Sequence, residues 1–159
     1  MMSYLVLKWL HVIGASVLLG TGAGIAFFML MAHRTGKPAI VAATARIVVV
    51  ADFLFTTTAV IAQPITGLLL VHTVGYELSE AWIVFSIMLY MVTGAFWLPV
   101  VWIQMRMRRL AEQAAAADKP LPSAYHRLFK VWFAFGFPAF AAVLGIFWLM
   151  IARPQVQLW

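Results

Sequence analysis

The sequence lacks cysteine and has few charged residues. None of its 159 residues is cysteine, and Asp, Glu, Lys and Arg together make up 10%. The absence of thiols excludes disulfides, thiolate metal sites and thiol catalysis. Soluble domains carry roughly 25% charged residues, whereas 65% of this chain is hydrophobic. There is too little polar side chain to cover a globule in water, so we predict an integral membrane protein.

Acidic residues are also scarce, with 5 against 11 Lys and Arg, which gives a net charge of +6. The basic residues lie at the ends of apolar runs, where they act as topology signals, so we expect no nucleic-acid partner. The sequence contains no nucleophile triad, phosphate loop, HExxH, CxxCH or dinucleotide fingerprint. The motifs therefore indicate no particular reaction, and we leave open whether the protein is an enzyme.

Four apolar runs are each long enough to cross a hydrocarbon layer of roughly 30 Å. We predict an all-α integral membrane four-helix bundle, a single transmembrane domain over residues 1–159, with spans at about 5–32, 47–72, 81–103 and 131–152. The first run has no cleavage site and is expected to be retained. Gly36 is predicted to end the first helix and Pro38 to start the second. Pro64 predicts a kink near Val60, and residues 104–122 are expected to form the longest solvent-facing connection.

Basic residues divide unequally between the two membrane sides. Four spans bring the N-terminus, the second loop and the C-terminus to one side, which carries only Lys8 and Arg153. The other side carries nine basic residues: Arg34, Lys37, Arg46, Arg106, Arg108, Arg109, Lys119, Arg127 and Lys130. The positive-inside rule predicts a multi-pass protein of the bacterial inner membrane with both termini on the periplasmic side.

A polar stripe follows the second span. Its members recur every three or four residues and therefore share one side of a helix: Asp52, Thr56, Ala59, Gln63, Thr66 and Gly67. Such groups must face protein, water or cofactor, so the stripe is either a proton or solute path or a set of interhelical hydrogen bonds. We expect Asp52 to pair with Arg46 or with a basic residue of the third loop. Gln63 is expected to bond the carbonyl that Pro64 leaves free.

Lys8, His11 and His72 are the candidate cofactor residues. Lys8 and His11 are three residues apart and share one face of the first helix, and His72 ends the second span on the same membrane side. Two histidines on neighbouring helices are the usual axial ligands of haem b in a bundle. The open alternatives are His11 and His72 as iron ligands, His11 with another ligand, or a packing histidine with Lys8 extending to the interface.

The chain resembles a bacterial family of predicted four-helix integral membrane proteins of unknown function over nearly its whole length. The likeness is carried by Leu7-Lys8-Trp9-Leu10-His11, Gln63-Pro64-x-Thr66-Gly67, Trp97-Leu98-Pro99-Val100 with Gln104, Tyr125-His126-Arg127-Leu128-Phe129, Trp132, Pro138 and Ile146-Phe147-Trp148-Leu149-Met150. The first helix also resembles that of HemJ-type protoporphyrinogen oxidases and of CopD-type copper-resistance membrane proteins. The chain lacks the Pro-Arg segment of HemJ. The likeness to HemJ implies that Lys8 and His11 are the positions to test.

Two functional hypotheses follow from these residues. In the first, a membrane bundle binds haem b through His11, together with His72 in one variant, and transfers electrons near the periplasmic face. Lys8 then neutralises a haem propionate or a quinone oxygen, the partner is a quinone or another membrane redox protein, and a homo-oligomer is compatible with the sequence. In the second, the protein is a non-enzymatic membrane subunit or a small-solute or ion permeation protein whose polar stripe only joins its helices.

Overall fold

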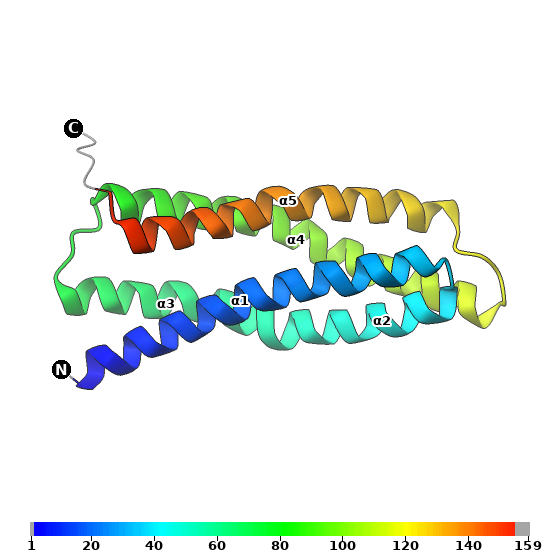
Figure 1. Ribbon diagram of the computed structural model, residues 1–159, viewed down its shortest axis with the longest axis horizontal. Coiled ribbons are helices and arrows are strands. Elements are labelled where there is room, and N and C mark those ends of the chain that lie inside the picture. Colours follow the sequence, from blue (N-terminus) through cyan, green and yellow to red (C-terminus); the bar gives the residue numbers. More distant parts are fainter. Residues whose placement is uncertain (1, 155–159) are drawn as a thin grey trace.

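The computed structural model describes residues 2–154 of the chain, and its regular elements are all helical (Figure 1). The elements are α1 (Met2–Thr35), α2 (Pro38–Ala51), the π-helix η1 (Asp52–Thr56), α3 (Thr57–Val74), α4 (Ala81–Ala116) and α5 (Ser123–Ala152). Because α2, η1 and α3 follow one another without a break, the described chain has four helices long and apolar enough to cross a membrane. The prediction of an all-α chain with four apolar helices is confirmed. Residues 1 and 155–159 of the predicted domain lie outside the described residues.

The helices extend well beyond the predicted spans. The second long helix begins at Pro38, before the span predicted from about residue 47, and α4 continues to Ala116, beyond the span predicted to end at about residue 103. The segment 104–122, predicted to be the longest solvent-facing connection, is helical as far as Ala116. Alanine, arginine, glutamate and glutamine all favour helix, and Arg108 and Glu112 form an i, i+4 ion pair of 3.9 Å that supports this extension.

The two tight turns follow the sequence signals. Gly36 adopts a positive φ of 64°, and Pro38 is the first residue of α2, as predicted. Gly75, with a φ of 83°, ends α3 and donates its N–H to the Val71 carbonyl at 3.0 Å. The α1–α2 connection and the α4–α5 connection lie at one end of the bundle, and the α3–α4 connection lies at the other (Figure 1).

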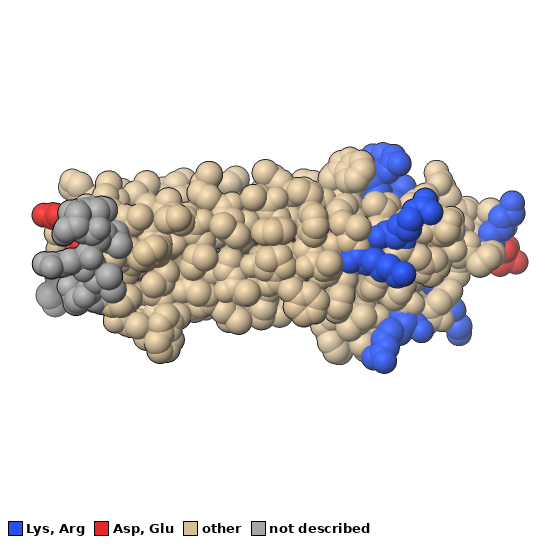
Figure 2. Space-filling view, turned by 90° about the horizontal axis from the view of Figure 1, so that it is seen from above, with Lys and Arg blue, Asp and Glu red and all other residues tan. Residues whose placement is uncertain are grey.

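Lysine and arginine side chains gather at that same end, as Figure 2 shows for one face of the molecule. We call it the basic end. The main apolar core lies in this half of the bundle, where α1, α2, α4 and α5 pack together. Its four largest fully buried side chains are Tyr125, Met29, Met107 and Val41.

The other half of the bundle is more loosely joined. There α3 packs along α1 and α4 packs along α5, whereas α3 makes little contact with α4 or α5 within the described residues. Large apolar side chains such as Ile65 and Leu68 are more than half exposed. In a bilayer these faces contact lipid, which is as apolar as they are.

The second long helix contains a π-helix at η1, which the sequence did not predict. Residues 52–56 form this π-helix, in which backbone hydrogen bonds span five residues instead of four, and α3 then continues as α-helix through Pro64. The kink predicted near Val60 stays a prediction. A hydrogen bond from α4, described below, satisfies the carbonyl that Pro64 leaves free.

Candidate functional site

His11 on α1 and Thr66 on α3 form the central polar contact between these helices. His11 Nδ1 lies 2.8 Å from Thr66 Oγ1. The same hydroxyl donates to the Ala62 carbonyl at 2.8 Å, one turn earlier on α3. A hydroxyl has one proton, so with that proton directed to the carbonyl His11 Nδ1 must be the donor to Thr66. His11 Nε2 is then unprotonated and has a free lone pair.

Gln63 forms a second bond between the same helices. Its Nε2 donates to the His11 backbone carbonyl at 2.9 Å. Two glycines allow the close approach: a Cβ at Gly14 would lie 2.4 Å from Gln63 Nε2, and a Cβ at Gly67 would lie 3.3 Å from His11 Cε1. The His11 imidazole is therefore fixed in position by α3, with its ring half-buried.

The structure does not bring the other two candidate cofactor residues into this contact. Lys8 is exposed, and its Nζ lies 5.8 Å from the centroid of the Tyr4 ring. His72 follows Gln63 by nine residues, which at 3.6 residues per turn turns it about 180° away. Because Gln63 faces α1, His72 is on the opposite side of α3, where it is exposed.

Asp52 and Thr56 occupy η1 and are each only 5% exposed. Trp97 Nε1 on α4 donates to Asp52 Oδ1 at 3.4 Å. The predicted pairing of Asp52 with Arg46 or with a basic residue of the third loop was wrong, because Arg46 bonds Glu112 Oε1 at 3.3 Å instead. Within the polar stripe, Asp52 therefore contacts α4, whereas Gln63 and Thr66 contact α1.

Tyr90 on α4 compensates for Pro64. Its hydroxyl donates to the Val60 carbonyl at 2.6 Å. In an unbroken helix that carbonyl would accept from the backbone N–H of residue 64, which proline lacks. The prediction that Gln63 satisfies this carbonyl was wrong, since Gln63 bonds His11. The periodicity of one helix could not reveal a partner on another.

His33 lies at the basic end among aromatic side chains. None of its contacts was predicted from the sequence. His33 stacks on Phe129 with ring centroids 3.6 Å apart and an interplanar angle of 8°. His33 Nδ1 is also 3.4 Å from the Tyr125 hydroxyl. Tyr125 and Phe129 are one turn apart at the start of α5, a spacing that could have indicated one contact face. Both are buried and serve the core.

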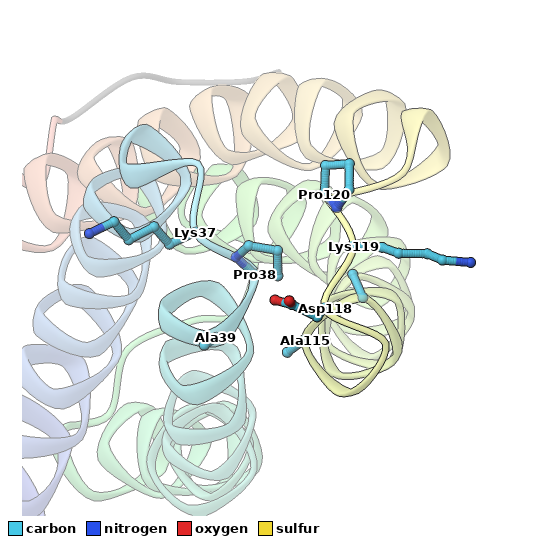
Figure 3. A pocket seen from close by; sticks show the side chains of 8 residues that line it. Lys37, Pro38, Ala39, Ala115, Asp118, Lys119 and Pro120 are labelled. Atoms are coloured by element: carbon cyan, nitrogen blue, oxygen red, sulfur yellow. The ribbon is translucent and has the colours of Figure 1, made fainter.

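A shallow pocket of about 280 Å³ lies between the α1–α2 turn and the α4–α5 loop (Figure 3). The side chains of Lys37 and Lys119 extend away from it, and the Asp118 carboxylate points toward Pro38. The pocket therefore presents little positive charge to an anion. Among residues 2–154, no group of three or more His, Asp or Glu side chains is arranged to bind a metal ion.

The family described as "Predicted integral membrane protein (DUF2269)" matches residues 5–154. This chain belongs to that family. The match covers all four long helices and includes His11, Gln63, Thr66, Asp52 and Trp97. It confirms the resemblance to predicted integral membrane proteins of unknown function. Searches of curated proteins and of solved structures found no match for this DUF2269 protein.

Proposed function

We propose that this DUF2269 protein binds haem b within the membrane, with His11 as an axial iron ligand, and transfers electrons. The observation that carries the proposal is the distance of 2.8 Å between His11 Nδ1 and Thr66 Oγ1, which favours the tautomer protonated at Nδ1. Histidine ligands usually donate one ring N–H to an oxygen of the protein and use the other nitrogen for the metal. The Nδ1 bond of 2.8 Å to Thr66 satisfies the first condition and leaves Nε2 for iron.

Thr66 and Gln63 are positioning residues in this proposal. Thr66 sets the tautomer and the ring orientation, and Gln63 fixes the His11 backbone through its bond of 2.9 Å. Bound haem would supply one-electron chemistry whose potential depends on its ligands and on nearby charge. Lys8, three residues before His11 and exposed, is suited to neutralise a propionate or a quinone oxygen. A quinone or another membrane redox protein is the proposed partner.

His72 of the same chain does not fit as the second axial ligand. It lies six residues beyond Thr66, about 9 Å along α3, and faces away from α1. His11 contacts Thr66 and His72 faces away from α1, so these two residues of one chain would not hold the same haem. In our proposal the second ligand comes from outside this helix pair, as His72 of a second copy would in a homo-oligomer.

The proposed location is the bacterial inner membrane, with both termini in the periplasm. The support is the distribution of charge: nine of the eleven basic residues belong to the basic end, part of which is visible in Figure 2. The positive-inside rule assigns that end to the cytoplasm. His11, near the opposite end of α1, then lies in the periplasmic half of the membrane.

An absorption spectrum of the detergent-purified protein tests the haem proposal. Wild-type protein expressed with ample haem should show a Soret band, and His11→Ala should lose it or change to a high-spin spectrum. His126→Ala, which removes an exposed histidine at the basic end, is the matched control and should retain haem. Lys8→Ala should retain it with a lower reduction potential, because removing a cation disfavours the added electron. A colourless wild-type protein would contradict the proposal.

The second candidate function is a non-enzymatic membrane subunit or a small-solute or ion permeation protein. The observation in its favour is that polar groups of the stripe have partners inside the protein: Gln63 bonds His11, and Asp52 accepts from Trp97. Such bonds suffice to join helices in a membrane. The same spectrum separates the two candidates, because this one predicts a folded and colourless protein.

A further inference from the structure

Asp52 is a buried carboxyl group next to exposed apolar side chains. The three residues that follow it, Phe53, Leu54 and Phe55, are 51%, 57% and 48% exposed on the lipid-facing surface, whereas Asp52 itself is 5% exposed. The π-helix at this point turns the carboxyl toward α4. Single π-turns inside α-helices are frequent at functional sites.

No cation faces this carboxyl from the helices around it. On α1 there is no titratable side chain between His11 and His33, on α3 none before His72, and on α5 none between Lys130 and Arg153. On α4 the first titratable group beyond the N-terminal turn is Tyr90, whose hydroxyl donates to the backbone of α3. The surrounding helices therefore offer Asp52 only the indole N–H of Trp97.

The basic residue nearest to Asp52 along its own helix is already paired. Arg46, six residues earlier, is 68% exposed and bonds Glu112. A carboxylate buried without a counter-ion costs several kcal/mol, and one hydrogen bond of 3.4 Å from an indole compensates little of that. A protonated, neutral carboxyl avoids most of this cost.

A column of polar side chains on α4 leads from Asp52 to the basic end. The column contains Trp97, Gln104 and Arg108, which follow one another after seven and four residues. At 3.6 residues per turn, Gln104 and Arg108 are each rotated by only about 20° from Trp97 around the helix axis, so all three share one face. Gln104 is 3% exposed, and its Nε2 has no hydrogen-bond partner in the protein. The buried Nε of Arg108 also lacks one. We call these three residues the α4 polar column.

Thr56 adds a polar atom at the end of this column. Its hydroxyl lies beside the Asp52 carboxyl and is itself buried. Buried polar groups that find no partner in the protein are usually hydrated by ordered water. The column thus supplies separated hydrogen-bonding groups between the basic end and the level of Asp52.

We propose that Asp52 is an exchangeable proton site, reached from the basic end along the α4 polar column. The proton comes from water at that end, binds a carboxylate oxygen of Asp52, and returns to water by the same route. Trp97 is a positioning residue that donates to the carboxyl, and the Thr56 hydroxyl lies beside it. This inference does not depend on haem binding at His11, which lies on α1 more than two helical turns from the level of Asp52 on η1.

Dicyclohexylcarbodiimide, an apolar reagent that reacts with protonated carboxyls, tests the charge state of Asp52. Wild-type protein in lipid vesicles at neutral pH should gain one adduct, mapped by mass spectrometry to Asp52, and Asp52→Asn should gain none. The other four acidic residues, toward the two ends of the bundle, are internal controls. Absence of an adduct on folded wild-type protein would overturn the proposal. Protection by Na⁺ or K⁺ but not by choline would also overturn it, because Asp52 would then bind a metal cation.

Infrared spectroscopy after transfer to D₂O tests the route. The carbonyl stretch of the protonated Asp52 carboxyl should shift as its proton exchanges for deuterium. In Gln104→Leu this exchange should slow about tenfold, equivalent to about 1.4 kcal/mol in the barrier, because hydrocarbon replaces a polar group of the column. Gln113→Leu, an exposed matched control on the same helix, should leave the rate unchanged. Equal rates in wild type and Gln104→Leu would refute the route.

Discussion

Replacing Gly14 by alanine is a sensitive test of the contact between α1 and α3. The added Cβ would lie 2.4 Å from Gln63 Nε2, far inside contact distance. Gln63 Nε2 is the end of a flexible side chain, so it can move away, but it then loses its bond to the His11 carbonyl. The expected consequence is the loss of one interhelical hydrogen bond rather than a general clash.

The loss of stability in Gly14→Ala is best measured by comparison with Gly20→Ala. A Cβ at Gly20 meets nothing within 4 Å, so this variant reports only the higher helix propensity of alanine, which favours it by about 1 kcal/mol in water. The same propensity gain applies at Gly14 and cancels in the comparison. Interhelical hydrogen bonds in membranes average about 0.6 kcal/mol, with a maximum of about 1.7. Gly14→Ala should therefore be less stable than Gly20→Ala by that amount.

Titration of the protein from mild detergent into sodium dodecyl sulfate measures the free energy of unfolding of each variant, Gly14→Ala and Gly20→Ala. A double-mutant cycle with Gln63→Ala identifies the cause. Once the Gln63 side chain is removed, Gly14→Ala should have the same effect as Gly20→Ala. If Gly14→Ala is as stable as Gly20→Ala in the wild-type background, or if its cost persists in Gln63→Ala, the described contact is wrong.

Three further predictions concern α4, the ion pair and the orientation. Tyr90→Phe should cost about 0.6 to 1.7 kcal/mol of unfolding free energy, and much less in a Pro64→Ala background, where a backbone N–H can bond the Val60 carbonyl; an equal cost in both backgrounds would contradict the assigned role. Arg46→Ala should change stability by less than about 1 kcal/mol because its ion pair is exposed, and a larger loss would show that the pair is buried in the membrane. A reporter active only in the periplasm should work at the C-terminus and fail within residues 117–122, and the reverse pattern would invert the orientation.

Composition and periodicity predicted the helices because each signal is local. Apolar runs, Gly36 and Pro38 identify helices and turns without reference to the rest of the chain. The extension of α4 to Ala116 was missed because a membrane-span criterion follows hydropathy and stops at the first charges. Helix propensity continues past them, since alanine and arginine favour helix in water as well.

The candidate site was predicted only in part, because its contacts depend on which helices meet. The polar stripe on the second long helix was visible from spacing, yet nothing in that spacing indicates that Gln63 and Thr66 face α1 while Asp52 faces α4. Trp97 and Gln104 stand seven residues apart, a spacing that places them on one face. However, the sequence does not show that Asp52 of η1 packs against this face, so the spacing alone indicates no function. The same helical period places His72 on the opposite side of α3 from Gln63.

We propose that Thr66 holds His11 with Nδ1 protonated and Nε2 free. Nitrogen-15 solid-state NMR of histidine-labelled, haem-free protein in bilayers measures this directly, with His11→Ala identifying the signals. We expect a protonated Nδ1 and an unprotonated Nε2 for His11, and loss of this preference in Thr66→Val. A His11 protonated at Nε2 in the wild-type protein would contradict it.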